Sequence, residues 1–155
     1  MYVNYFRIGY RVSATDQQTK PIFASAVDCE RAFYAAFIER SFESMRGVWA
    51  DEHVSCIHPG SRDVLRGNEA VLAAWKSILE MDEVPDIRVV LLERESGRDL
   101  TTHLVREEIY SQDGVIRAVA YATNIFRREA DSWRMVGHHG SVASLTAKSP
   151  SRSLH

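Results

Sequence analysis

Two neighbouring segments in the last third of the chain contain an amide and two imidazoles that could take part in chemistry. The segment 121–126 contains Asn124, and the segment 133–141 contains His138 and His139. Both segments have strand composition, and we expect them to be neighbours in a curved sheet. Because adjacent side chains on a strand point to opposite faces, the two histidines cannot both enter one cavity. We favour His138 inside and His139 toward a partner, but parity leaves the choice open, so His139 is also a candidate ligand contact.

The same alternation predicts which neighbours accompany each histidine. Val136 should share a face with His138, whereas Trp133 and Met135 should share a face with His139. An indole and a thioether can line a pocket, and they can equally form the apolar centre of a dimer interface, where both residue types are enriched.

Glu107 is a candidate proton carrier in the middle of a predicted strand. It has the parity of Val105 and Ile109. If that parity faces a cavity, desolvation disfavours the charged carboxylate and the group can shuttle a proton. If it faces outward, Glu107 is a solvated or dimer-bridging residue, and Glu108 takes the inner place with Arg106. The alternation alone does not decide between these arrangements.

Two further polar residues are candidates for a site. His58 precedes the strand-breaking Pro59, where it can bind a ligand at a cavity mouth, act as a general base, or simply stabilise the turn. Asn124 interrupts an apolar strand, and a buried amide needs hydrogen-bond partners. It can orient a ligand, or it can bond backbone or a neighbouring imidazole.

Three aromatic residues on predicted helices are candidate pocket walls. Tyr34, Trp49 and Trp75 lie on the inward stripes of their helices. Aromatic stripes at helical spacing also form ordinary core, so they are either walls of a ligand site or structural packing.

A metal site and a cysteine nucleophile are both disfavoured. The sequence has no His-x-x-x-His or His-x-His spacing, so zinc would require one strand histidine to converge with His58 and Glu107. Neither Cys29 nor Cys56 has a sequence signal for activation by a histidine, and their spacing suits no disulfide framework. We therefore predict no metal and no cofactor.

The helices and strands that must position these residues can be predicted from the spacing of apolar residues. This spacing changes once along the chain, from helical to strand periodicity. Helical spacing predicts helices over about 27–40, over a shorter stretch begun by Ser41, and from Gly67-Asn68 onward. A brief strand at 54–58 ends at Pro59-Gly60. Turn residues then separate strands near 87–95, 100–111, 115–127 and 133–143. Helices followed by antiparallel strands predict an α+β fold, with three helices packed on a strongly curved sheet to form a cone.

Composition excludes several classes of protein. The chain has 155 residues, 45% hydrophobic and 26% charged, with a formal net charge of -2. This composition predicts one globular domain without a membrane span, and it provides no basic cluster for binding nucleic acid. Because the N-terminus does not have the pattern of a signal peptide, we expect a cytoplasmic location.

The two ends of the chain have a different character from the middle. Residues 1–24 combine one strand parity with a polar stretch, which predicts an N-terminal extension that adds an edge strand. Residues 25–144 form the domain. Residues 145–155 are rich in serine and aperiodic, as is typical of a flexible tail.

Seven ordered segments resemble a SnoaL-like domain of the nuclear transport factor 2-like superfamily. The resemblance covers about 27–143 and is carried by 33–37 (Phe-Tyr-Ala-Ala-Phe), 48–51 (Val-Trp-Ala-Asp), 56–60 (Cys-Ile-His-Pro-Gly), 66–71 (Arg-Gly-Asn-Glu-Ala-Val), 107–109 (Glu-Glu-Ile), 122–126 (Ala-Thr-Asn-Ile-Phe) and 133–139 (Trp-Arg-Met-Val-Gly-His-His).

This resemblance implies a cone-shaped fold, a homodimer formed through the sheet, and a hydrophobic pocket between helices and sheet. It favours Glu107 as the inward carboxylate, since that residue matches the acidic position of the family. It implies no single reaction, because the superfamily includes isomerases, cyclases, dehydratases and kinase association domains.

Two functions follow as alternatives. In the first, the protein binds a small, largely hydrophobic molecule in its cone without converting it, since the Asp/His pair of related isomerases and dehydratases is not recognisable here. In the second, it is an isomerase, cyclase or dehydratase in which Glu107, His58 and His138 transfer protons. In either case Tyr34, Trp49, Trp75, Asn124 and His139 are the expected ligand contacts.

Overall fold

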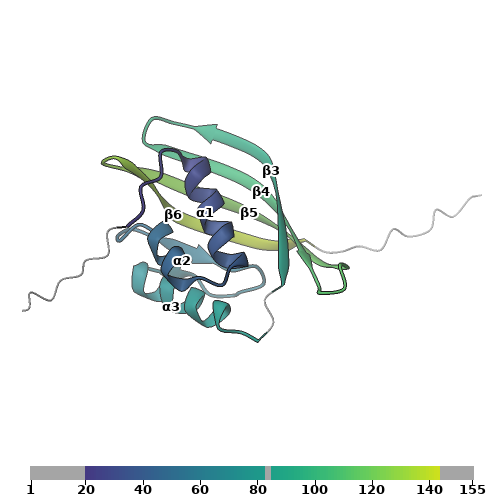
Figure 1. Ribbon diagram of the computed structural model, residues 1–155. Helices are drawn as coiled ribbons and strands as arrows, with labels where there is room; N and C mark the ends of the chain where they lie inside the picture. Colours follow the sequence, from purple (N-terminus) through teal and green to yellow (C-terminus); the bar gives the residue numbers. More distant parts are fainter. Residues whose placement is uncertain (1–19, 83–84, 144–155) are drawn as a thin grey trace, which may run out of the picture.

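Three helices lie on one side of a six-stranded sheet (Figure 1). The structure is a computed structural model, and it describes residues 20–82 and 85–143. The predicted edge strand within residues 1–19 and the predicted tail at 145–155 lie outside the described residues. The elements are α1 (Ala26–Ile38), α2 (Phe42–Val48), β1 (Ser55–Ile57), β2 (Leu65–Arg66), α3 (Asn68–Leu79), β3 (Asp86–Ser96), β4 (Leu100–Tyr110), β5 (Ile116–Glu129) and β6 (Ser132–Ala143).

The helices begin where their capping residues place them. The Ser25 hydroxyl accepts a hydrogen bond from the Asp28 amide, and Ser41 caps α2 in the same way. These bonds satisfy amides that have no partner within the helix. Gly67 precedes α3 with φ 87°, a left-handed conformation that suits glycine. The three predicted helix starts are confirmed to within a residue.

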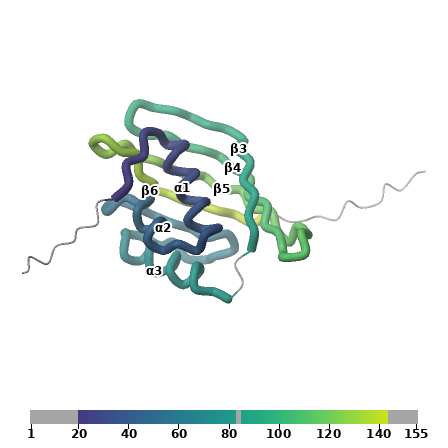
Figure 2. Tube along the Cα trace, viewed as in Figure 1, coloured from purple at the N-terminus to yellow at the C-terminus, as the bar shows by residue number. Residues whose placement is uncertain are grey.

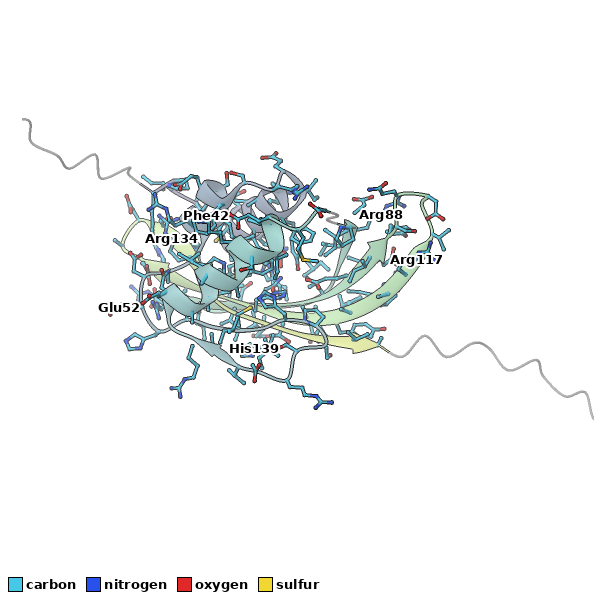
Figure 3. The ribbon with its side chains drawn as sticks, turned by 90° about the horizontal axis from the view of Figure 1, so that it is seen from below. Phe42, Glu52, Arg88, Arg117, Arg134 and His139 are labelled. Atoms are coloured by element: carbon cyan, nitrogen blue, oxygen red, sulfur yellow. The ribbon has the colours of Figure 1, made fainter. Side chains whose placement is uncertain are left out.

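The sheet has the strand order β2-β1-β6-β5-β4-β3. Strands β3 to β6 form the predicted antiparallel meander, whereas β1 runs parallel to β6. The Asp113-Gly114 turn between β4 and β5 places Gly114 at φ 78°. The tube in Figure 2 follows α1 across the sheet, and Figure 3 shows the sheet curving around the helix layer. The α+β cone is confirmed.

A β-bulge in β6 corrects one prediction from strand parity. Ile125 pairs with Gly137 and Phe126 pairs with Met135, so Val136 is an extra residue between two consecutive pairs. The bulge brings Met135 onto the helix-facing side together with His138, and Met135 is fully buried in the core. The expectation that Met135 shares a face with His139 was wrong because regular alternation fails at this point.

Residues 20–24, which belong to the predicted extension, contact the domain. Lys20 Nζ donates to the Trp49 carbonyl at 3.1 Å, and the Phe23 amide donates to Ser132 Oγ at 2.9 Å. Phe23 also packs against the core. None of the helices in the described ranges combines the length and the apolar character needed to cross a membrane.

Candidate functional site

A cavity of about 210 Å³ opens between the concave face of the sheet and helices α1 and α3. Its wall contains five residues singled out from the sequence and six that are apolar or proline. The first group is Tyr34, His58, Trp75, Glu107 and His138, and the second is Phe33, Phe37, Pro59, Ile78, Ile87 and Ile109. The wall is therefore largely apolar, with a few polar groups that can fix an orientation, as in ligand sites generally.

Strand register brings the polar groups onto one face. His103 of β4 pairs with Asn124 of β5, Asn124 pairs with His138 of β6, and His138 pairs with Cys56 of β1. Directly paired residues point to the same side of a sheet. Glu107 lies two alternations beyond His103 on β4 and so faces the same side, where it is 3% exposed. Four strands thus supply one inward row.

Of the two arrangements left open for β4, the structure has Glu107 inward. Glu108 points to the opposite side of the sheet, where it pairs with Arg106 at 2.5 Å and accepts a hydrogen bond from Tyr110 at 2.8 Å.

His58 reaches the cavity because the chain leaves β1 next to β6. A Cβ on Gly140 would lie 2.6 Å from Pro59 Cγ, so glycine at this position of β6 permits the close approach of Pro59. The His58 ring then packs edge-on against Trp75, with 4.6 Å between ring centroids, and lies 6.5 Å from the His138 ring. His58 is part of the cavity wall.

The polar groups of the wall are joined through Tyr34 and Asn124. Tyr34 Oη donates to Glu107 Oε1 at 2.7 Å, and Asn124 Nδ2 donates to Tyr34 Oη at 3.0 Å. Asn124 Oδ1 lies 2.7 Å from His138 Nδ1. A carboxylate, a phenol, an amide and an imidazole therefore form one connected network, in which each member fixes the orientation of the next.

The network continues behind the cavity to two residues that the sequence analysis did not identify. Asn124 Nδ2 donates to Glu30 Oε1 at 2.9 Å, and Glu30 Oε2 lies 2.9 Å from His103 Nδ1. Two features of the sequence place these residues on the inward faces of their elements, although neither feature indicates the contact with Asn124. Glu30 precedes Tyr34 by four residues on one helix face, and His103 has the strand parity of Glu107.

Burial controls the protonation of the groups on the wall. Desolvation raises the pKa of Glu107, and the hydrogen bond from Tyr34 partly opposes this rise. Desolvation and the nearby Glu107 raise the pKa of Tyr34, which therefore remains a phenol and a donor. Desolvation also lowers the pKa of His58 and, with the charges of His58 and His139, lowers that of His138 to about 3. Both imidazoles are neutral at pH 7.

Three of the expected ligand contacts lie off the cavity wall. Trp49 is fully buried in the core, with its ring 6.3 Å from Phe33. Asn124 is fully buried behind the wall and acts on it through hydrogen bonds. His139 points to the other side of β6, where its Nε2 lies 3.0 Å from Ser55 Oγ (Figure 3).

The arrangement of the described residues gives little support for a metal ion or a reactive thiolate at this site. Among the residues that the structure describes, no group of three or more His, Cys, Asp or Glu side chains is arranged to hold a metal ion. Cys56 lies 3.7 Å from His58 Nε2, but burial raises the pKa of its thiol to about 12. The thiolate needed for nucleophilic attack is therefore scarce.

Comparisons with known proteins identify a domain family and not a single activity. A family model described as a SnoaL-like domain matches residues 27–144. A proposed calcium/calmodulin-dependent protein kinase type II association domain from Thiobacillus denitrificans is 40% identical, with TM-score 0.76 over 80% of this chain and 99% of that one. A proposed dehydratase of the NTF2-like family from Streptomyces avermitilis is 30% identical, with TM-score 0.66 over 75% of this chain and 91% of that one.

A curated relative is longer than this chain. The F-box protein SKIP8 from Arabidopsis thaliana is 26% identical over 120 residues, which are 71% of this chain and 46% of that protein. The similarity thus spans less than half of that relative.

Proposed function

The chain belongs to the SnoaL-like domain family, and from this premise we propose that its cone binds a small, largely hydrophobic molecule. The observation that carries the proposal is the cavity of about 210 Å³, whose largely apolar wall contains four titratable side chains, those of Tyr34, His58, Glu107 and His138. An apolar cavity that is not filled by side chains lacks the van der Waals contacts of a close-packed core. A bound molecule would supply these contacts.

The size of the cavity limits the ligand. An engineered apolar cavity of about 150 Å³ holds benzene. A volume of about 210 Å³ therefore suits a single ring or a short branched chain, part of which can extend through the mouth of the cavity.

A thermal-shift screen tests this proposal. Small aromatic and alicyclic compounds should raise the Tm of the wild type in proportion to ligand concentration and affinity. The variant Ile109→Trp, which fills the cavity, should lose this response, and Ile22→Trp, at a side chain that is 67% exposed, should keep it. Stabilisation that is equal in both variants, or absent throughout, would defeat the proposal.

Acid–base catalysis is the second candidate, and the contact between Glu107 and Tyr34 favours it. A carboxyl group with a raised pKa, held by a phenol at 2.7 Å and facing an apolar cavity, suits proton transfer. The relative from Streptomyces that is 30% identical and named a proposed dehydratase supports this reaction class. With its pKa near 3, His138 holds a proton poorly at pH 7. In this mechanism, Glu107 and His58 carry protons and His138 accepts a hydrogen bond.

Turnover decides between binding and catalysis. The stabilising compounds found in the screen should be incubated with the wild type and with Glu107→Gln, and the products analysed by mass spectrometry. Conversion by the wild type that falls at least 100-fold in Glu107→Gln would support catalysis. Ligand-dependent stabilisation without conversion would support binding alone.

We also propose that two copies associate through the outer face of the sheet. That face exposes Val90, Leu104 and Tyr121, which lie on three neighbouring strands. The relative that is 40% identical and named an association domain supports a role in assembly. Light scattering after gel filtration should give twice the mass of one chain, and a monomer at micromolar concentration would defeat the proposal.

A further inference from the structure

The orientation of the Asn124 amide is fixed by what its neighbours can accept. Glu30 Oε1 and Tyr34 Oη both lie on its Nδ2 side, at 2.9 and 3.0 Å. As a carboxylate, Glu30 can only accept hydrogen bonds, whereas a phenol can either donate or accept. The one hydrogen of Tyr34 is donated to Glu107 Oε1, so Tyr34 Oη also accepts from the amide. The charged Glu30 is the stronger of these two acceptors, which together turn the NH₂ group of Asn124 toward α1 and its Oδ1 toward β6.

The amide in turn fixes the tautomer of His138. Asn124 Oδ1 lies 2.7 Å from His138 Nδ1, and two such atoms bond only if the nitrogen carries the hydrogen. A neutral imidazole has one N–H, so His138 Nε2 has a free lone pair. This nitrogen bonds no other group in the described part of the chain, and the ring lines the cavity. His138 therefore presents an acceptor to a ligand.

The cavity wall also lacks a partner for an anion. No lysine or arginine is among the described residues that line it, and Glu107 contributes a carboxyl group. A ligand carboxylate or phosphate would face the His138 lone pair and Glu107 without a compensating cation. Its desolvation would be unfavourable.

We propose that the cavity selects a non-anionic ligand bearing an O–H or N–H group that donates to His138 Nε2, and that Glu30 sets this preference by holding Asn124. The inference rests on the proposed binding function and adds the polarity of the ligand to it. Glu30 is a positioning residue in this scheme, because it acts on the ligand through Asn124 and His138. A phenol or a compact alcohol has the required chemistry.

Binding of four one-ring probes tests this preference. Phenol supplies the donor, toluene retains its size without oxygen, anisole retains the oxygen without the hydrogen, and benzoate adds a negative charge. By NMR titration at pH 7, phenol should bind the wild type about tenfold more tightly than anisole, since an unpaired buried acceptor is costly. Benzoate should be weaker still. Equal affinities for phenol and anisole, or a preference for benzoate, would overturn the inference.

The tautomer can be measured without any ligand. Long-range ¹H–¹⁵N correlation spectra of the wild type should show His138 with a protonated Nδ1 and an unprotonated Nε2. In Glu30→Ala the two tautomers should mix, and the preference for phenol over anisole should fall below about threefold. The matched control is Glu39→Ala, at the exposed C-cap of the same helix, which should leave both measurements unchanged.

The outcomes separate this inference from the proposed function. If toluene and anisole bind as well as phenol, the hydrophobic cavity stands and the donor preference is wrong. If none of the probes binds, both fail. If Glu30→Ala does not fold, the wild-type tautomer still decides, because a protonated Nε2 on His138 would remove the acceptor on which the preference depends.

Discussion

The two ends of the concave face differ in how completely they are packed. At one end Phe126, Met135 and Trp49 are fully buried against the helices and each other. At the other end Glu107 and Ile109 face a cavity of about 210 Å³. The same strands, β4 to β6, run through both ends. One half of this sheet therefore stabilises the fold, and the other half is free to carry a site that stability does not require.

Truncating one side chain at each end of the concave face tests this difference in packing. Phe126→Ala should lower the free energy of unfolding by about 3–5 kcal/mol, because it leaves a void in close-packed core. Ile109→Ala should cost only about 1 kcal/mol, since one side of Ile109 already faces the cavity. Urea denaturation measures both values. Similar losses at the two positions would mean that the cavity end is as tightly packed as the core.

Acidification should destabilise the cavity end through His138. Its pKa is lowered to about 3 in the folded protein, from an ordinary value of 6.5, because the ring is desolvated. The unfolded chain therefore binds the extra proton between these values, and stability falls as pH decreases through that window. From pH 7 to pH 5 this group should cost about 2 kcal/mol.

The contribution of His138 is isolated by comparing variants. Urea denaturation of the wild type and of His138→Gln at both pH values should show a smaller pH dependence in the variant. The control His53→Gln, on the exposed surface, should retain the wild-type dependence. An unchanged pH dependence in His138→Gln would show that the imidazole is solvated.

Ionisation of Glu107 should change the free energy of unfolding with pH in the opposite direction to that of His138, and by a smaller amount. The pKa of Glu107 is raised mainly by desolvation, so the folded protein holds this proton to higher pH than the unfolded chain. The stability from this group is complete below its unfolded pKa and is lost as pH rises through its folded pKa. At pH 8, Glu107→Gln should raise the free energy of unfolding by on the order of 1 kcal/mol, because it removes a buried charge and can still accept from Tyr34.

The control for this substitution lies on the next residue. Glu108→Gln removes a charge that pairs with Arg106 on the outer side of the sheet. It should lower stability slightly at the same pH, so a gain in Glu108→Gln or a loss in Glu107→Gln would contradict the assignment of the two faces.

The smallest effect on stability is expected on the outer face of the sheet. Tyr121 is 43% exposed, so Tyr121→Ser should change the free energy of unfolding of the monomer by less than about 0.5 kcal/mol. If two copies associate through this face, the same substitution should weaken the dimer at least tenfold in analytical ultracentrifugation. An unaltered dimer would place the interface elsewhere.

The elements were predictable where local signals agree. Ser25 and Ser41 at helix starts, the Asp113-Gly114 turn and the strand parities indicated three helices and four long strands. Strand β2, of two residues, has no periodicity to detect. The parallel pairing of β1 with β6 depends on tertiary packing, and no local pattern encodes it.

The site was predictable only in part, for a different reason. His138, Glu107, His58, Tyr34 and Trp75 line the cavity, yet the bulge at Val136 places Met135 on an unexpected face. A bulge is set by packing between strands and not by the residue type at that position. The contact of Glu30 with Asn124 joins positions 94 residues apart, which no short pattern reveals.

The occupied cavity can be observed directly by NMR. With phenol added to protein labelled at isoleucine methyl groups, we expect saturable shifts and nuclear Overhauser contacts from the phenol ring to Ile87 and Ile109, which line the cavity. In Ile109→Trp, the saturable shifts and the contacts to Ile87 should be lost. Contacts that fall instead on the outer face of the sheet, or shifts that do not saturate, would contradict the claim that the hollow end of the cone is a ligand site.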